Sequence, residues 1–293
     1  MKYKVVLVTV TYKANLTEVA QCLKSIDFYN DIGSELKIVV VDNSPPTESI
    51  PIEFQKNFPD VSFVFAPENK GFGYSNNIGA SLFDSDYLLF FNNDTELVQP
   101  VFTKLIAEME ADSSVGCIGI KQECGNPSFF RRPEAFVPYW RMKKDIKNDR
   151  YNNREYFIPG AFMFFRTACF FEIGKFDENI FMYYEEPDIC NRVQAYNYKV
   201  NYNKALTFNH KTGSRHSFSK QTYQVMLTSY FYYMKKYKYD TLVFRDLKSQ
   251  ILMMLFKGII LAFSFQFNVA IQLFRGAIIY LKALNDFLKK NKK

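Results

Sequence analysis

Four short apolar runs in the first third of the chain predict buried β-strands. They lie at residues 4–10, 37–41, 61–65 and 87–91. Uninterrupted apolar runs of this length are typical of strands covered on both faces, as in a parallel sheet. Apolar residues also recur at helical spacing from Leu16 to Ile26, behind a predicted helix cap at Asn15. This alternation of strands and helices predicts a doubly wound α/β domain.

The middle of the chain predicts two further strands around a long connection. The apolar run 157–166 predicts one strand, entered through Pro159 and Gly160, and residues 199–208 predict another. Residues 122–153 are rich in proline, basic and aromatic residues and predict a long irregular loop or lid over the site. A packed excursion without a functional role is the alternative interpretation.

Polar clusters end three of the four first strands, at what would be one edge of the sheet. They are Thr11-Tyr12, Asp42-Asn43-Ser44 and Asn92-Asn93-Asp94. Open α/β sheets bind ligands at the carboxyl ends of their strands. One carboxylate beside two amides suffices to hold Mg²⁺ or Mn²⁺ when a diphosphate supplies the remaining ligands. An Asn-Asn-Asp turn without a metal is the alternative.

A glycine-containing segment, 68–77, follows the third predicted strand and carries Gly71 and Gly73. Backbone amides at such glycines could approach a diphosphate closely, although an ordinary glycine turn explains them equally well. A helical segment is expected to follow, up to about Leu82. No G-x-G-x-x-G motif follows the first strand, so a standard dinucleotide-binding fold is not expected.

Three carboxylates, Glu185, Glu186 and Asp188, lie at the predicted start of a helix that has Pro187 in its first turn. Aromatic residues precede them directly. Adjacent carboxylates beside an apolar wall raise one another's pKa, which suits a general base. Acids that merely favour the dipole of a solvated helix start are the alternative.

The two histidines of the chain, His210 and His216, follow the last predicted strand in a segment that also holds Lys211 and Arg215. Imidazole is a common metal ligand. This group could therefore meet a diphosphate or a metal, whereas a polar surface loop is the alternative.

The charge is distributed unevenly along the chain. The formal net charge of +7 divides into +9 for residues 235–293 and −2 for the rest. A basic segment beside apolar residues favours anionic lipid over nucleic acid as a partner. The five cysteines lack metal-type spacing and favour reduced thiols in a cytosolic compartment, and the first ten residues lack the layout of a signal peptide. We therefore expect a cytoplasmic protein.

A helical tail is expected over residues 218–293, behind the α/β domain of residues 1–217. An aromatic helix is predicted at 223–239 and a single long apolar helix over 251–285. A narrow polar stripe would run along that long helix, formed by Lys257, Ser264, Asn268, Arg275 and Lys282. This pattern predicts peripheral binding to a membrane surface, at the inner face of the cell membrane. Packing on the catalytic domain or on a partner subunit is the alternative, and a homo-oligomer is left open.

Taken in order, these segments resemble the family 2 glycosyltransferases of the GT-A fold, and they are similar to the bacterial rhamnosyltransferase-like members. The resemblance covers about residues 4–217. Each motif alone is weak, whereas the ordered series is specific. The matching segments are Val10-Thr11-Tyr12, Val41-Asp42-Asn43-Ser44, 68–79, Phe91-Asn92-Asn93-Asp94, 159–163, 184–188 and His210.

The resemblance implies how a nucleotide-sugar donor would be bound. The expected contacts are Thr11, Tyr12, Asp42, Asn43, Asn69, Gly71, Gly73, Asn76 and Asn93. Asp94 stands at the last position of the family's D-x-D motif and would meet Mg²⁺ or Mn²⁺, while Asn92 replaces the first acid. His210 matches the histidine that often completes the metal or diphosphate contacts.

The resemblance also implies the catalytic residues and the reaction. Glu185 and Glu186 match the family's Glu-Asp pair, whose second member is the base, so Glu186 is the expected base and Asp188 its nearest competitor. The implied reaction is an inverting hexosyl transfer in cell-surface polysaccharide synthesis. The donor would be dTDP-rhamnose, or a UDP-sugar as the second choice, and the acceptor a hydroxyl of a glycan or glycolipid.

Two rival hypotheses come from other functional classes. A nucleotidyltransferase would usually carry a basic glycine-rich loop after the first strand, and residues 8–15 contain none. A non-catalytic scaffold that binds a nucleotide sugar within a polysaccharide assembly is the other. The presence of both Asp94 and Glu186 argues against such a scaffold.

Overall fold

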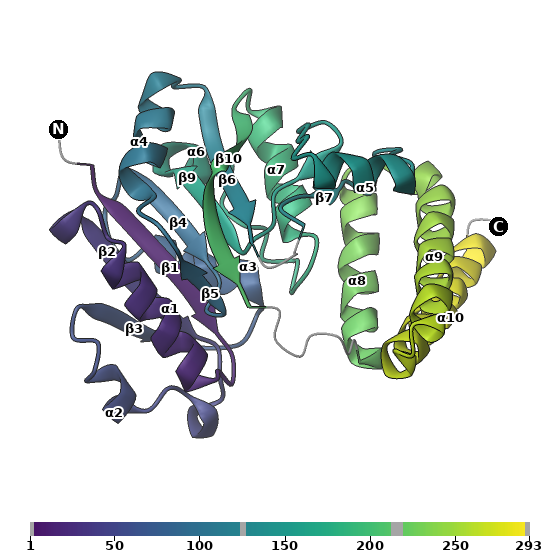
Figure 1. The fold of residues 1–293 in the computed structure, drawn as a ribbon, viewed down its shortest axis with the longest axis horizontal. Coiled ribbons are helices and arrows are strands. Elements are labelled where there is room, and N and C mark those ends of the chain that lie inside the picture. The colour runs from purple at the N-terminus through teal and green to yellow at the C-terminus, as the bar shows by residue number, and fades with distance from the viewer. Residues whose placement is uncertain (1–2, 124–126, 212–218, 291–293) are drawn as a thin grey trace.

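A mixed eight-stranded sheet forms the centre of the larger part of the molecule (Figure 1). The computed structural model describes residues 3–123, 127–211 and 219–290. The strands lie in the order β3-β2-β1-β4-β9-β6-β10-β5. Their bounds are β1 Val5–Thr11, β2 Leu36–Asp42, β3 Val61–Phe65, β4 Tyr87–Phe91, β5 Thr95–Leu97, β6 Val115–Gln122, β9 Phe162–Arg166 and β10 Lys199–His210.

The first four strands are parallel and in a register that aligns their carboxyl ends. Thr11 pairs with Asp42, and Asp42 pairs with Phe65. β4 lies on the other side of β1 and is also parallel to it. The predicted parallel half is therefore confirmed, and the polar residues that end β1, β2 and β4 meet at one edge of the sheet.

Helices cover both faces of this sheet because neighbouring strand residues point to opposite sides. Val5 and Leu7 pack with α1 and α4, whereas Val6 and Val8 pack with α3, α6 and α7. Asn15 caps α1 as predicted, since its side chain accepts a hydrogen bond from the Thr17 amide at 3.0 Å. The helices are α1 Leu16–Phe28, α2 Ile52–Gln55, α3 Phe72–Ala80, α4 Phe102–Ala111, α5 Tyr139–Lys147, α6 Thr167–Glu172 and α7 Glu185–Ala195.

The expected single strand over 157–166 is wrong. Tyr156–Phe157 forms β8, which pairs with β7 (Phe130–Arg131) in a separate two-stranded sheet, and β9 begins only at Phe162. Pro159 lacks the N–H group that a central strand needs for its ladder. The Pro159-Gly160 pair therefore turns the chain from one sheet into the other instead of leading into a continuous strand.

The stretch 122–153 is also less irregular than expected. It contains β7 and the helix α5, which was not predicted. Phe129, Val137 and Tyr156 form a small buried cluster beneath them. The connection is thus a packed excursion with its own hydrophobic core.

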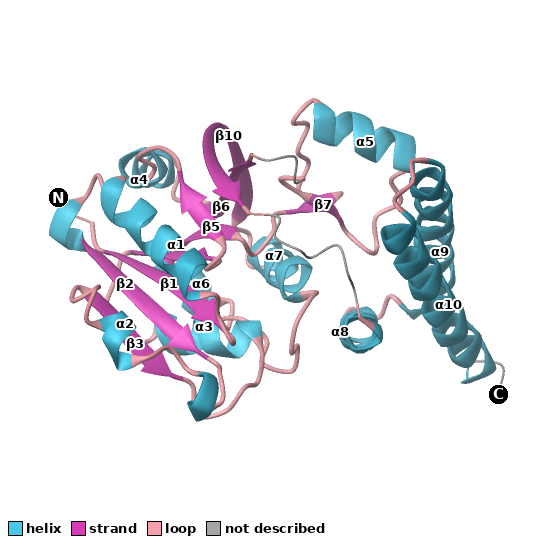
Figure 2. Ribbon diagram, turned by 60° about the horizontal axis from the view of Figure 1, so that its bottom comes forward, coloured by secondary structure: helices cyan, strands magenta, loops and turns pink. Residues whose placement is uncertain are grey.

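The tail consists of three helices: α8 Lys220–Lys236, α9 Asp240–Phe263 and α10 Phe267–Lys290. The aromatic helix α8 is confirmed, but the single long helix over 251–285 is wrong. The chain turns back between Ser264 and Gln266, so that α9 and α10 form the antiparallel hairpin seen in Figure 2. The proposed polar stripe does not exist, because Lys257 and Arg275 lie on different helices.

Glycine allows the close helix packing that a sequence pattern does not reveal. A Cβ atom at Gly258 would lie 2.8 Å from the Phe274 ring, and one at Gly276 would lie 2.4 Å from the Tyr223 ring of α8. Within the described residues, α10 is the one helix long and apolar enough to cross a membrane, with a mean hydropathy of 1.3. Only 28% of its most apolar window is buried against the rest of the protein.

Four of the five cysteines, Cys22, Cys117, Cys169 and Cys190, are buried free thiols, as expected. Cys124 lies outside the described residues, as do Arg215, His216 and the expected domain boundary at residue 217.

Gly276→Val should destabilise the tail, because the added side chain would collide with Tyr223. Overpacking of this kind typically costs about 1–3 kcal/mol of unfolding free energy. Ile278→Val is the matched control, since Ile278 is exposed on the same helix and should change stability by less than about 0.5 kcal/mol. Urea denaturation of the two variants measures the difference. Equal stabilities would contradict the packing of α10 on α8 and would restore a single extended helix.

Candidate functional site

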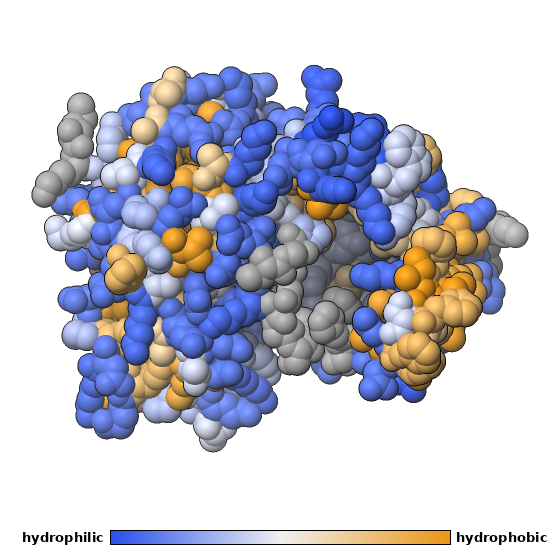
Figure 3. All heavy atoms as spheres, viewed as in Figure 1, coloured by the Kyte–Doolittle hydropathy of each residue, from blue (hydrophilic) through white to orange (hydrophobic). Residues whose placement is uncertain are grey.

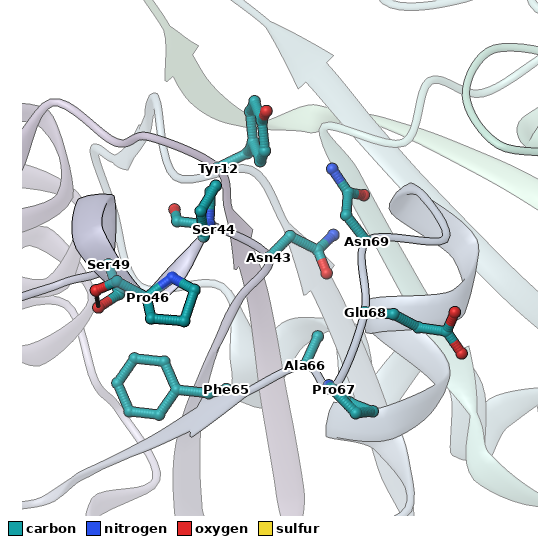
Figure 4. A pocket seen from close by; sticks show the side chains of 11 residues that line it. Tyr12, Asn43, Ser44, Pro46, Ser49, Phe65, Ala66, Pro67, Glu68 and Asn69 are labelled. Atoms are coloured by element: carbon teal, nitrogen blue, oxygen red, sulfur yellow. Dashed lines mark hydrogen bonds between the residues drawn. The ribbon is translucent and has the colours of Figure 1, made fainter.

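A pocket of about 460 Å³ opens at the carboxyl ends of β1, β2 and β3. In Figure 4, Asn43 and Asn69 line one side of it, Tyr12 lies at one end, and Phe65 lies at the opposite end. An aromatic ring beside side-chain amides offers stacking and hydrogen bonding to a flat polar ring. The size and lining of the pocket fit a nucleoside.

Asp42 is buried and directly precedes Asn43 and Ser44, which line this pocket. One carboxylate oxygen accepts hydrogen bonds from the Ser44 amide at 3.0 Å and the Ser44 hydroxyl at 2.6 Å. The other accepts from the Ile50 amide at 2.7 Å. Asp42 therefore holds the loop from Asn43 to Ile50 in place, and in this structure it shapes the pocket through that loop.

Asn43 ties the pocket to the start of α3, and Asn76 bonds within that helix start. The Asn43 amide accepts from the Ser75 hydroxyl at 2.6 Å and donates to the Gly71 carbonyl at 3.4 Å. Asn76 is buried and donates to the Phe72 carbonyl at 3.0 Å. These two predicted contacts both fix the helix start, so their polar groups are partly committed within the protein.

Gly71 and Gly73 have a packing reason that the sequence did not suggest. Gly71 has a φ of +101°, and a Cβ atom there would lie 1.7 Å from the Phe181 carbonyl oxygen. The next amide, of Phe72, donates to that same carbonyl at 3.0 Å. A Cβ atom at Gly73 would lie 2.8 Å from the Phe176 side chain. The glycines thus let the segment after β3 dock against the segment before α7.

Asp94 and His210 are brought together by the pairing of β5 with β10, in which Thr95 opposes His210. The His210 Nε2 atom lies 3.3 Å from a carboxylate oxygen of Asp94. Its Nδ1 atom lies 2.7 Å from Gln122 Oε1, and the Gln122 side-chain amide donates to the Pro127 carbonyl at 2.8 Å. Because that donation orients the amide, its oxygen faces Nδ1 and accepts the Nδ1 proton. The other ring nitrogen, Nε2, faces Asp94.

This pair fits a divalent cation such as Mg²⁺ or Mn²⁺. A carboxylate oxygen and an imidazole nitrogen held by a second hydrogen bond form a usual partial ligand set for such ions. No group of three or more His, Cys, Asp or Glu side chains that could hold a metal occurs in the described part of the chain. Two protein ligands would leave room for oxygens of a diphosphate. Asn93, half-buried, lies beside Asp94 in the turn between β4 and β5.

The acid pair at the start of α7 lies across from the Pro159-Gly160 turn. The Gly160 amide donates to Glu186 Oε1 at 3.1 Å. Burial raises the pKa of Glu186 above the usual range despite this hydrogen bond. Burial, and then the neighbouring Glu186 charge, raise the pKa of Glu185 well above the usual range. Glu185 is only 5% exposed, and its Oε2 atom has no hydrogen-bond partner among the described residues.

Asp188 has a different environment one turn further along α7. It is fully buried, and one oxygen accepts from Arg192 at 2.8 and 2.9 Å. The other oxygen contacts Lys236 and accepts from the Tyr237 hydroxyl at 2.9 Å. A carboxylate with both oxygens occupied and no access to solvent is poorly placed to take a proton from a substrate. Asp188 is thus a structural anion that ties α7 to the tail.

Gln122, Gly160 and Asn77 serve the site without having been predicted. Asn77 bonds both backbone groups of Phe176, at 3.0 Å each, and so fixes the segment that approaches α7. Gly160 could have been suspected from its place in the Pro-Gly-Ala motif. Gln122 and His210 are 88 positions apart, and nothing in the sequence links them.

The sequence profile of glycosyl transferase family 2 matches residues 6–172, more than half of the chain. This chain belongs to glycosyltransferase family 2. No curated protein matches it. The nucleoside-sized pocket, the Asp94–His210 pair and the acid pair are therefore features of a family 2 chain.

Solved structures show the same fold at low identity. The mannosyltransferase PcManGT from Pyrobaculum calidifontis, in complex with GDP-Man and Mn²⁺, has a TM-score of 0.58 at 14% identity, covering 96% of this chain and 88% of that one. GalNAc-T7 with UDP, GalNAc and Mn²⁺ has a TM-score of 0.58 at 13% identity, covering 77% and 47%. TarS from S. aureus has 0.52 at 15%, covering 76% and 38%. The chain thus spans less than half of the last two. The fold is that of the GT-A glycosyltransferases, as expected.

Glu185→Gln should stabilise the protein increasingly as the pH rises. Because burial raises the pKa of Glu185, the folded protein holds this proton more tightly than the unfolded chain, whose carboxyl titrates near about pH 4.3. Wild type therefore loses stability above that pH, up to the folded-state pKa, and the variant loses less because only Glu186 still contributes. Urea denaturation at about pH 5 and about pH 8 measures this difference. Glu53→Gln, at an exposed ion pair, is the control; the same pH dependence in both variants would rule out the burial effect.

Proposed function

We propose that this family 2 chain transfers a sugar from a nucleotide-diphosphate donor to a hydroxyl group of a glycan or glycolipid, with inversion of configuration. The observation that carries the proposal is the Asp94–His210 pair, with Nε2 facing the carboxylate at 3.3 Å, at the sheet edge that also holds a nucleoside-sized pocket. In this arrangement the nucleoside lies between Tyr12, Asn43 and Asn69. The diphosphate reaches toward Asp94.

Each residue has a role that its surroundings support. Thr11 and Asp42 end neighbouring strands, and Asp42 sets the shape of the nucleoside wall. Asp94 and His210 hold a divalent cation, Mg²⁺ or Mn²⁺, with Asn93 beside them. When bound, the cation supplies positive charge against the diphosphate leaving group. Gly71, Gly73 and Asn76 keep the start of α3 in its position next to the donor.

Glu186 is the base in this proposal. Its Oε1 atom is held by the Gly160 amide at 3.1 Å, so the carboxylate has a fixed direction. Burial raises its pKa, which makes it a better proton acceptor than an exposed glutamate once it is ionised. Glu186 takes the proton of the acceptor hydroxyl as that oxygen attacks the anomeric carbon. One displacement with one base inverts the configuration.

The motif resemblance and the neighbouring structures together indicate which donors to test. The rhamnosyltransferase-like motifs favour dTDP-rhamnose. The neighbours bind GDP-Man or UDP, each with Mn²⁺, so UDP-sugars and GDP-mannose belong among the donors to test. The acceptor belongs to cell-surface polysaccharide synthesis.

Loss of either Asp94 or Glu186 should abolish transfer by different routes. Asp94→Ala should weaken both Mn²⁺-dependent donor binding and turnover. Glu186→Gln should keep donor binding and lose about 10²–10⁴-fold in turnover, as expected for removal of a general base. The assay is transfer and donor hydrolysis with dTDP-rhamnose, UDP-sugars and GDP-mannose, on membranes as acceptor source, with Mg²⁺ or Mn²⁺. NMR of the product determines the configuration at the anomeric carbon.

Glu53→Gln serves as the control for that assay and should retain full activity. Full activity of Glu186→Gln would move the base to Glu185 or Asp188. Donor binding by wild type without transfer or hydrolysis on any acceptor would instead support the non-catalytic scaffold.

The tail supports a place at the membrane for this reaction. Figure 3 shows a largely apolar surface over the α9–α10 hairpin, in contrast to the mostly hydrophilic body. Exposed side chains there include Leu252, Phe256, Phe263, Phe265, Phe267 and Ile278. The basic charge of residues 235–293 complements anionic lipid. We propose that residues 1–217 catalyse transfer and that residues 218–293 attach the enzyme to the cytoplasmic face of the membrane, near a lipid-linked acceptor.

Charge at the hairpin turn should release the protein from lipid. Phe263 and Phe265 are 83% and 84% exposed, and Phe263→Asp with Phe265→Asp should lower flotation with phosphatidylglycerol-containing vesicles at least about fivefold. Phe28→Asp, at an equally exposed phenylalanine of α1, is the control and should float as wild type does. Wild type that forms a dimer in gel filtration and does not float would assign the apolar surface to a second copy of the chain.

A further inference from the structure

Two consecutive tyrosines before the acid pair adopt a backbone conformation that bulky residues avoid. Tyr183 has a φ of +67° and Tyr184 a φ of +72°. No other two consecutive non-glycine residues in the described part of the chain both have positive φ. Left-handed backbone at a residue with a large side chain costs about 1–3 kcal/mol and persists only where surrounding contacts impose it. The next residues are Glu185 and Glu186.

The contacts that hold this turn come from the tail. The Ser229 hydroxyl of α8 donates to the Met182 carbonyl at 2.8 Å. The Tyr184 ring packs against the rings of Tyr230 and Tyr233, at centroid distances of 5.5 and 5.8 Å. Both of these rings are fully buried. The left-handed turn is therefore fastened to α8 on both its backbone and its side chain.

The same helix also holds the first two turns of α7. Asp188 contacts Lys236 and accepts from Tyr237 at 2.9 Å, and Asn191 donates to the Tyr233 hydroxyl at 2.7 Å. Asp188 and Asn191 lie on one face of α7, about 60° apart, whereas Glu186 points about 140–160° away from both. One face of α7 is thus bound to the tail while Glu186 faces Gly160.

We propose that α8 positions the catalytic base, Glu186. Ser229 of α8 and Tyr184, which packs on α8, are the positioning residues. The proposal rests on the function proposed above, because it takes Glu186 as the base. Without the contacts to α8, the turn at 183–184 would relax toward negative φ. Glu186 follows two residues later, so that relaxation would turn its carboxylate away from the Gly160 amide and from the acceptor hydroxyl. The donor pocket lies at the carboxyl ends of β1, β2 and β3 and contains no residue of α7 or α8, so we expect donor binding to be retained.

Ser229→Ala tests the backbone contact. We expect kcat to fall about three- to tenfold, the effect of one lost hydrogen bond, with the KM for donor changed less than twofold. Thr228→Ala is the matched control, because the Thr228 hydroxyl donates only to Gln224 within α8 at 3.0 Å. Equal kcat values for the two variants would overturn the role of Ser229.

Tyr184→Ala, alone and combined with Glu186→Gln, separates positioning from a general loss of structure. We expect Tyr184→Ala to lower kcat at least tenfold in wild type and less than twofold in the Glu186→Gln background, because a base that is absent cannot be misplaced. Donor affinity, measured by titration with nucleotide and Mn²⁺, should stay within twofold and shows that the fold is retained.

The outcomes distinguish this inference from the function it rests on. An equal loss in both backgrounds would mean that Tyr184 is merely structural and would overturn the positioning role. Full activity of Glu186→Gln alone would remove the base from the proposed function, and the positioning role with it. An inactive Glu186→Gln beside a fully active Tyr184→Ala would leave the proposed function standing and reject α8 as its positioning element.

Discussion

The close contact between Gly71 and the Phe181 carbonyl joins the two halves of the site. The parallel half of the sheet supplies the nucleoside-sized pocket and Asp94, whereas the acid pair belongs to the later segment that leads into α7. Only a residue without a Cβ atom lets these backbones meet, since a Cβ at Gly71 would lie 1.7 Å from the Phe181 oxygen. The hydrogen bond from Phe72 to the same carbonyl and the bonds of Asn77 to Phe176 then fix the distance between the nucleoside-sized pocket and the acid pair.

Three carboxylates within four positions have different properties because their surroundings differ. Asp188 is fully buried, yet cationic and hydroxyl partners satisfy both of its oxygens. Burial without such partners raises the pKa of Glu185, and burial opposed by one backbone amide raises that of Glu186. A buried charge is tolerated only where partners replace the water it loses. The site therefore contains one structural anion and a pair whose protonation can respond to a substrate.

The tail has two surfaces with different properties. On its inner surface, α8 packs against α7. Asp246 of α9, which is buried, pairs there with Arg131 of the packed excursion. Its outer surface, on α9 and α10, exposes large apolar side chains. The helices that would meet a lipid surface are thus fastened, through α8, to the turn that carries the acid pair. Membrane attachment and catalysis would thus both depend on the contacts of α8.

The sequence by itself determined the α/β order, the parallel strands and the edge at which Thr11, Asp42 and Asp94 lie, because strand periodicity and polar strand ends are local signals. It also determined the family, since the motifs recur in a fixed order. Tertiary structure alone decided the break at Pro159-Gly160, the folding back of α9 on α10 and the contact of Gln122 with His210. It decided as well that Asp188 is a structural anion and that Gly71 is needed for packing. These features depend on contacts between residues far apart in the chain, and apolar spacing along one segment carries no information about them.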